Sequence, residues 1–330
     1  MINRREFMIA AAGSILTAAT KSGEDFTSRL KGDILQKKAI VSMVKTSDRD
    51  SGIKRAIDLL KINPVRGKNV LLKPNFNTAD PFPGSTHNDT LINLILSLRK
   101  MGAKTITIGE RSGPPKTSNV LKEKGIYDIC RIFDVGLINF EELPASDWIK
   151  IKPEKSHWRN GFDVAKPVID SKCIVTTCCL KTHGYGGVFT MSLKLSVGIT
   201  NKKNMAELHA SPLMRKMIAE INQAYTPSLI LLDGIEAFID DGPAKGIKKR
   251  ADVILAGTDR IAIDAIGLAI LKELGSNPAI METKIFEQEQ IARAVELGLG
   301  VTHPSEIEIV TDSATGSKYA KKIMEILLRG

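Results

Sequence analysis

The segments KNVLLKP (68–74), NDTLINLILSLRKMG (88–102) and KTITIG (104–109) follow one another along the chain, and their pattern decides the fold. The first and third are short apolar runs typical of buried strands. The second repeats its apolar residues at helical spacing and ends at Gly102, a typical helix cap. The same order occurs upstream, where the strand-like AIVSMV (39–44) precedes the helix-like GIKRAIDLLKI (52–62). This alternation predicts a parallel sheet with crossover helices.

The downstream part of the chain continues the alternation after an irregular region. Prolines interrupt the pattern between residues 111 and 165, which predicts an insertion or the junction of two lobes. Beyond it we predict strands at 173–180, 228–234, 251–257 and 306–312, and helices at 189–199, 214–225 and 261–275. The predicted fold class is α/β. Residues 39–330 would form a doubly wound, mostly parallel sheet, as one domain or as two intimate lobes.

The N-terminal segment MINRREFMIAAAGSILTAAT (1–20) has the pattern of an export signal. Arg4 and Arg5 precede an uncharged apolar run that is shorter than the roughly 20 residues of a membrane span. We therefore predict a twin-arginine signal at 1–20 and a polar linker at 21–38. The translocase would export the protein to the periplasm or another extracytoplasmic site, where an uncleaved signal would anchor it. The alternative is an amphipathic first helix that packs on the domain.

The composition favours small anionic ligands over nucleic acid. The formal net charge is +10 and the pI is about 9.3, which favours acidic partners. Aromatic residues make up 5% of the chain, too few to suggest a stacking surface for single-stranded nucleic acid. The four cysteines show no CxxC spacing, so we predict buried apolar residues and no iron–sulfur cluster. We also predict no integral membrane span once the signal is removed.

Polar and ionisable residues follow the predicted strands, at the edge where open parallel sheets bind ligands. In chain order these candidates are Lys73, Asn75, Thr86, His87, Glu110, Arg111, Lys181, His183, Asp233, Asp240, Asp241, Thr258 and Asp259. Structural explanations remain open for some of them. Thr258 or Asp259 would cap the helix at 261–275, and Glu110 with Arg111 would form a solvated ion pair.

The segment LKTHGYGG (180–187) joins a lysine, a histidine and three glycines. Backbone N–H groups of Gly184, Gly186 and Gly187 would cradle a carboxylate or phosphate if they open the next helix, and Lys181 would add a charge. The alternative is a flexible turn. His183 would carry protons or bind a metal, unless it is a structural histidine with satisfied hydrogen bonds.

Several short motifs occur in a characteristic order: KPN at 73–75, Thr86-His87, GAK at 102–104, LKTH at 180–183, SLK at 192–194, Gly198, DGI at 233–235, GP at 242–243 and AGTDRIAIDA at 256–265. Together they resemble domain-of-unknown-function family 362 (DUF362) over most of residues 39–275. Several members of that family carry an iron–sulfur module, for which this chain lacks the cysteines. The sequence departs from the family pattern at Leu195, usually Asn, and at 239–241, usually Glu-Gly-rich. The family is also distantly similar in architecture to the nickel-dependent lactate racemases.

These observations favour an exported protein with an enzyme-like site for a small anionic ligand, assisted by a divalent metal or an inserted cofactor. The expected catalytic residues are His183, Lys181 and His87. The expected ligand-binding residues are Lys73, Asn75, Thr86, Gly184, Gly186, Gly187 and Lys194, and the expected metal ligands are Asp233, Asp240 and Asp241. We predict that Lys73, His87, Lys181, His183 and Asp233 converge on one cleft. The alternatives are a non-catalytic binding or redox-accessory protein and a purely structural exported protein.

Overall fold

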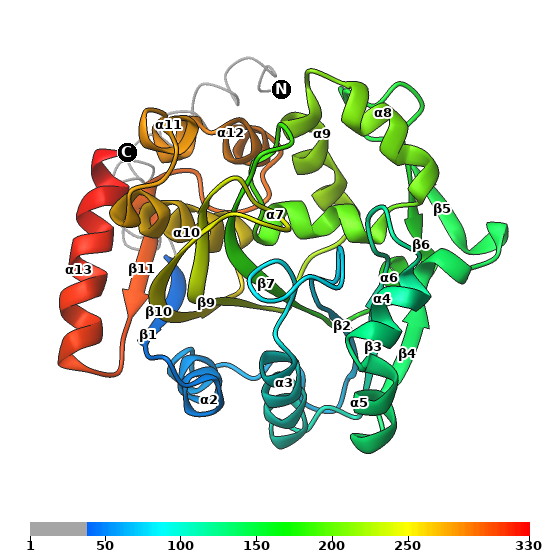
Figure 1. Ribbon diagram of the computed structural model, residues 1–330, viewed down its shortest axis with the longest axis horizontal. Coiled ribbons are helices and arrows are strands. Elements are labelled where there is room, and N and C mark those ends of the chain that lie inside the picture. The colour runs from blue at the N-terminus through cyan, green and yellow to red at the C-terminus, as the bar shows by residue number, and fades with distance from the viewer. Residues whose placement is uncertain (1–37) are drawn as a thin grey trace, which may run out of the picture. The chain divides into compact units, whose positions relative to one another are not determined.

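A mixed sheet forms the centre of residues 38–330, the part of the chain that this computed structural model describes. Its strands lie in the order β11-β1-β10-β9-β7-β2-β3-β4, and β8 pairs with β7 beside this path (Figure 1). In that order the strands span Ile307–Val310, Ala39–Lys45, Ile247–Gly257, Leu229–Asp240, Ile174–His183, Asn69–Lys73, Thr105–Glu110 and Gly136–Asn139, and β8 spans Val188–Phe189.

Most strand pairs in this sheet are parallel. The neighbours β4, β3, β2, β7 and β9 pair in parallel, as do β1 and β11, whereas β10 is antiparallel to both of its neighbours. The predicted α/β class with a mostly parallel sheet is therefore confirmed. Because β2, β3 and β7 run in the same direction, their carboxyl ends meet at one edge of the sheet.

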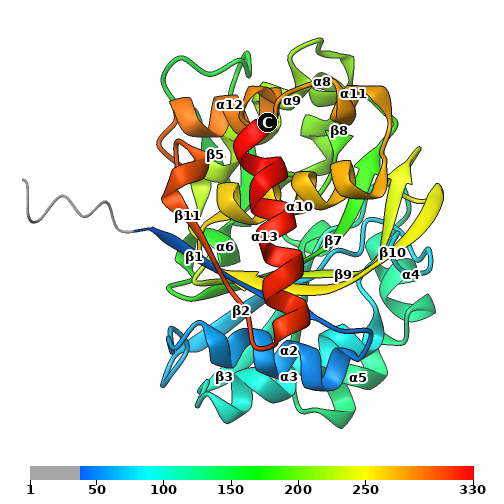
Figure 2. The same cartoon turned by 90° about the vertical axis from the view of Figure 1, so that its left-hand side faces the viewer.

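One face of the sheet is covered by α2 (Arg49–Leu59), α3 (Asn88–Lys100), α4 (Thr117–Glu123) and α5 (Ile126–Ile132), and Figure 2 shows α2, α3 and α5 together on that side. In α3, Leu91, Leu94, Ile95 and Leu98 recur at helical spacing and are fully buried. They join Leu72 of β2 in one apolar cluster. Burial of each such side chain contributes about 1.5–3 kcal/mol, so this face fixes the position of β2.

Helices also cover the opposite face (Figure 2). They are α7 (Ser192–Leu195), α8 (Met205–Ala210), α9 (Met214–Ile221), α10 (Arg260–Leu274), α11 (Pro278–Met281), α12 (Glu289–Glu296) and α13 (Ala314–Arg329). The α10 helix is buried all round from Arg260 to Leu271, as its nearly continuous apolar sequence requires. Asp259 caps this helix, because its Oδ1 accepts a hydrogen bond of 2.8 Å from the Ala262 N–H.

The irregular region at 111–165 lies within a single structural unit that spans residues 39–330. It contributes α4, α5 and β4, and then a separate pair of antiparallel strands, β5 (Trp148–Ile151) and β6 (Phe162–Ala165), which α6 (Lys166–Asp170) follows. Phe162 packs with Trp158, Phe140 and Met217 in a third apolar cluster. The four cysteines are free and buried, as predicted.

The helix predicted at 189–199 is mostly absent. Phe189 belongs to β8, α7 has only four residues, and a 3₁₀ turn follows at Ser196–Ile199. The segment cannot start as a helix at 189 because the Thr190 N–H still donates to the Lys181 carbonyl, at 3.0 Å, and so continues the pairing with β7. The signal predicted at 1–20 and nearly all of the linker at 21–38 lie outside the described residues. Within residues 38–330, no helix has the length and apolar character to cross a membrane.

Candidate functional site

A cavity of about 740 Å³ opens at the carboxyl ends of β2, β3 and β7. Its charged and imidazole lining comes from these strand ends, from α7 and α8, and from the turn at 202–204. The side chains are Lys73, Glu110, Arg111, Lys181, His183, Lys194, Lys202 and His209. The strand-end rule thus located the cavity, because the three parallel strands deliver their last residues to one edge of the sheet.

Lys181 is buried, and its hydrogen-bond partners among residues 38–330 are two neutral oxygens. The side chain is 1% exposed, and its Nζ donates to Asn75 Oδ1 at 2.8 Å and to the Gly84 carbonyl at 2.5 Å. Thr86 holds Asn75 in place, since its Oγ1 accepts a hydrogen bond of 2.9 Å from the Asn75 N–H. Burial is the main cause that lowers the pKa of Lys181.

Lys73 forms a buried ion pair with Glu110. The Lys73 Nζ lies 2.5 Å from Glu110 Oε1, and the carboxylate also accepts the N–H groups of Phe76, at 2.8 Å, and of Arg111, at 2.9 Å. Burial lowers the pKa of Lys73 and raises that of Glu110, and the pairing opposes both shifts. The interpretation of Glu110 and Arg111 as a solvated ion pair is therefore wrong: both are buried, and the cation partner of Glu110 is Lys73.

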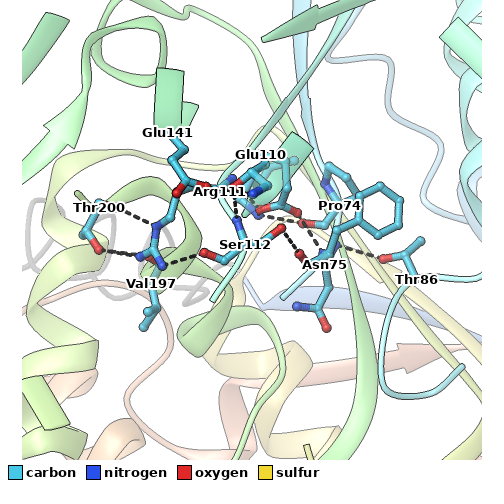
Figure 3. Close-up of polar contacts among 12 residues, drawn as sticks. Pro74, Asn75, Thr86, Glu110, Arg111, Ser112, Glu141, Val197 and Thr200 are labelled. Carbon is cyan, nitrogen blue, oxygen red and sulfur yellow. Dashed lines mark hydrogen bonds and ion pairs between the residues drawn. The ribbon is translucent and has the colours of Figure 1, made fainter. Parts of the chain in front are cut away.

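Hydrogen bonds from the Arg111 guanidinium link residues 197–200 to the end of β3 (Figure 3). Its Nε donates to the Thr200 carbonyl at 2.8 Å, its Nη1 donates to the Ser112 carbonyl at 3.0 Å, and its Nη2 donates to the Val197 carbonyl. All of these acceptors are neutral. Burial lowers the pKa of Arg111 to about 10, and the nearby Glu110 opposes that shift, so the side chain stays cationic near neutral pH.

Lys194 and His183 face the cavity without partners. Within residues 38–330, Lys194 Nζ makes no hydrogen bond or ion pair, and His183 Nδ1 is buried without a hydrogen-bond partner. Burial, followed by Lys181 and Arg111, lowers the pKa of Lys194 to about 8. Burial, followed by Lys194 and Lys181, lowers the pKa of His183 to about 2, so this imidazole is neutral.

Gly187 allows these two side chains to approach. A Cβ at this position would lie 2.8 Å from His183 Nδ1 and 3.0 Å from Lys194 Cε. The imidazole and the lysine chain therefore pack on the space that a side chain would fill. Here the close approach of neighbours requires the glycine.

The lining carries an excess of positive charge. Five cations face the cavity with a single carboxylate, Glu110, among the lining residues. Glu110 pairs with Lys73, and Lys202 pairs with Glu141 at 2.8 Å. Arg111, Lys181 and Lys194 are left, within the described part of the chain, without a carboxylate partner. Since unpaired buried charges are costly, this arrangement suits a ligand that brings negative charge.

Two residues expected in the cleft lie elsewhere. Asp233 is 1% exposed, and its Oδ2 accepts hydrogen bonds from Arg49 Nε at 2.8 Å and Thr90 Oγ1 at 2.5 Å. His87 caps α3 through a hydrogen bond of 3.1 Å from the Asp89 N–H to its Nδ1. The prediction of one common cleft is wrong for both. Because β9 continues to Asp240, Asp233 lies inside the strand and beneath α2 and α3 rather than at the strand end.

The carboxylates expected to bind a metal are dispersed. Asp240 Oδ1 accepts a hydrogen bond of 3.0 Å from Asn277 Nδ2, Asp241 is exposed, and Asp233 pairs with Arg49. Across residues 38–330, no group of three or more His, Cys, Asp or Glu side chains is arranged to hold a metal ion. The predicted set of metal ligands is therefore not assembled in this structure.

The glycine loop does not open a helix. Gly184, Gly186 and Gly187 connect β7 to β8, and the Gly184 N–H donates to the Asp241 carbonyl at 2.6 Å. The N-terminus of α7 is occupied by Asp264, whose carboxylate accepts the N–H groups of Ser192 and Leu193 at 2.7 and 2.9 Å. The predicted backbone cradle for an anion is therefore not formed.

Some lining residues carried no usable signal in the sequence. His209 lies in the short α8 helix, where a single histidine has no motif around it. Tyr185 is 75% exposed and its ring meets that of His183 edge-on, with centroids 6.0 Å apart. Met205 and Met214 add apolar surface to the cavity wall. Only the folding of 185–214 over the strand ends brings these residues to the site.

Fold and site together define an α/β protein with a cavity at the carboxyl ends of β2, β3 and β7, whose charged lining residues are mostly cations. Residues 70–269 match the family described as "Domain of unknown function (DUF362)", and the chain belongs to that family. The match covers β2 from Val70 onward, all of β3 and β7, and every charged residue that lines the cavity.

Comparison with known proteins gives a distantly similar sequence and some solved structures of limited similarity. The chain is 25% identical over 255 residues to a thylakoid-associated protein of Synechocystis sp. (strain ATCC 27184 / PCC 6803 / Kazusa), covering 74% of this chain and 75% of that protein. The structure of the lactate racemase apoprotein from Thermoanaerobacterium thermosaccharolyticum aligns with a TM-score of 0.45 and 12% identity, covering 86% of this chain and 85% of that one. A protein of Thermotoga maritima aligns with a TM-score of 0.43 and 15% identity, over 67% of this chain and 56% of its own.

Proposed function

We propose that this protein binds a small anionic ligand, a carboxylate or a phosphate, in the cavity at the ends of β2, β3 and β7. The observation that carries the proposal is the group of three cations, Arg111, Lys181 and Lys194, that have no carboxylate partner in the described part of the chain. A volume of about 740 Å³ is in the range of small-molecule sites, about 300–1,000 Å³.

The three cations differ in their hydrogen-bond partners. Arg111 donates hydrogen bonds to backbone carbonyls, and Lys181 donates to Asn75 and Gly84. Both side chains therefore add positive charge to the cavity and hold its wall in place. Among the residues that the structure describes, none accepts a hydrogen bond from Lys194, so its amino group can donate to a ligand oxygen. A hydrogen bond of this kind to an ionised acceptor is among the stronger ones in proteins.

His183 is positioned to transfer protons in addition to lining the binding site. Its imidazole lines the cavity, and burial, followed by the neighbouring cations Lys194 and Lys181, gives it a low pKa. A bound anion would offset those charges and raise the pKa of the imidazole. The ligand itself would therefore make His183 a better proton acceptor.

Isothermal calorimetry with malonate, citrate and phosphate tests the proposal. We expect at least one of these anions to bind wild-type protein, and Lys194→Met to weaken that binding. Lys203→Met is the matched control, because it also removes one positive charge but lies outside the cavity, where Lys203 pairs with Asp163 at 3.2 Å. An equal loss of affinity in both variants would show that binding depends on net charge alone, which would contradict a specific site. Absence of binding by every anion would favour a protein partner instead.

We also propose export by the twin-arginine translocase. The support is Arg4-Arg5 followed by a short uncharged run in the sequence. Fractionation of the native host tests it: the protein should be found outside the cytoplasm.

A further inference from the structure

The lysines that line the cavity differ in what their amino groups contact. Lys73 pairs with Glu110, Lys202 pairs with Glu141, and Lys181 donates to two neutral oxygens. The amino groups of these three lysines are therefore all engaged with protein acceptors. Lys194 is the exception among the four lining lysines of the described chain, because its Nζ faces the cavity with no acceptor.

The surroundings of Lys194 favour the neutral amine. The side chain is partly buried, and burial, followed by the nearby cations Lys181 and Arg111, lowers its pKa to about 8. Desolvation and a neighbouring cation are the two means by which proteins activate a lysine as a nucleophile. The same two cations would attract a carboxylate or phosphate group of a ligand. A carbonyl carbon in that ligand could then lie next to the Lys194 amine.

We infer that Lys194 is a nucleophile that forms a Schiff base with an anionic carbonyl compound, a 2-oxo acid or a phosphorylated aldehyde, bound in this cavity. The inference rests on the proposed function, because it needs the anionic group to be held there. In the step, the Lys194 nitrogen bonds to the carbonyl carbon. The carbonyl oxygen then leaves as water with the two hydrogens of the neutral amine. One C=N bond replaces one C=O bond, and nothing is oxidised or reduced.

The packing around Gly187 places His183, a group that can transfer protons, next to Lys194. Gly187 lies between His183 and Lys194, since a Cβ on this residue would be 2.8 Å from His183 Nδ1 and 3.0 Å from Lys194 Cε. The carbinolamine that precedes the Schiff base must gain a proton on oxygen and lose one from nitrogen. The neutral imidazole of His183 also lines the cavity, and such a group can exchange protons with the reacting atoms.

Borohydride trapping on the full chain tests the inference. Wild-type protein is incubated with pyruvate in one arm and glycolaldehyde phosphate in the other, reduced with sodium borohydride, and mapped by peptide mass spectrometry. We expect a reduced adduct on Lys194 in at least one arm, and the arm that reacts identifies the anionic group. At saturating concentrations of either compound, the rate of adduct formation should increase as pH rises through about 8, because the amine loses its proton there.

Trapping on wild-type protein and on Lys194→Arg, together with anion titration of the wild type, separates this inference from the proposed function, since arginine forms no stable imine. An adduct on Lys194 of the wild type that is lost in Lys194→Arg supports a nucleophilic lysine, and Lys203→Arg should behave as wild type. Anion binding without any adduct on Lys194 of the wild type overturns the inference and leaves the proposed function intact. An adduct on Lys181, or one spread over surface lysines, also overturns it. If neither compound nor any other anion binds, the proposed function fails as well.

Discussion

Replacing Lys194 and Lys181 separately by methionine should separate binding from stability. Both lysines line the cavity, and methionine fills a similar volume without the charge. Lys194 has no acceptor within residues 38–330, so its removal leaves no protein oxygen without a donor. Lys181, in contrast, donates to Asn75 Oδ1 and to the Gly84 carbonyl, and its removal leaves both of these oxygens without their donor.

The contacts give the expected magnitudes. A hydrogen bond to a charged group contributes about 1.5–3 kcal/mol, so Lys194→Met should weaken anion binding by about 10- to 150-fold. Its melting temperature should stay the same or rise, because a cation repelled by Lys181 and Arg111 is gone. For Lys181→Met, two unsatisfied oxygens cost about 1–3 kcal/mol each, and relief of a desolvated charge offsets part of this. A net loss of about 2 kcal/mol would lower the melting temperature by about 4 °C.

Calorimetric titration and thermal unfolding of the same preparations measure both effects. Lys203→Met serves again as the control for net charge. The assigned roles are wrong if Lys194→Met melts well below wild type while binding anions normally, because Lys194 would then support the fold. They are also wrong if Lys181→Met is as stable as wild type, because its two hydrogen bonds would then contribute nothing.

Three further predictions concern pH, the buried ion pair and export. Anion affinity should fall as pH rises through about 8, since Lys194 is charged below its lowered pKa and neutral above it; titrations at pH 6.5 and 9.5 that agree would argue against a role for its charge. Glu110→Gln should cost about 3–5 kcal/mol of stability in urea unfolding, because it leaves the Lys73 ammonium buried without its partner; an unchanged midpoint would show that Lys73 finds another acceptor or loses its proton. Changing Arg4 and Arg5 together to Lys should block export without altering the unfolding curve, and mature protein outside the cytoplasm would contradict the signal.

The parallel core of the fold could be predicted because its signals are local. The segments at 68–74, 88–102 and 104–109 became β2, α3 and β3 to within a residue or two, since apolar spacing alone specifies strands and helices of this kind. The length of β9 could not be predicted in the same way. Its second half, from Gly234 to Asp240, is paired with β10, and such pairing depends on a strand that comes later in the chain.

The length of β9 explains the error at Asp233. A strand ending at Asp233 would have delivered this carboxylate to the cavity, whereas the longer β9 encloses it with Arg49 and Thr90. The strand-end lysines were located correctly in the lining, because β2 and β7 do end near Lys73 and His183. Which lysine has a free amino group could not be read from the sequence, because the acceptors of Lys181 come from residues 75 and 84, about a hundred positions away.

Crystallography with selenate tests the anion site most directly, because selenium is located by its anomalous scattering. Crystals of wild-type protein and of Lys194→Met, soaked at the same concentration, provide the comparison. We expect selenate in the wild-type cavity with an oxygen within hydrogen-bonding distance of Lys194 Nζ, and a weaker or missing signal in the variant. Selenate confined to surface lysines, with none in the cavity of the wild type, would contradict an anion site at the ends of β2, β3 and β7.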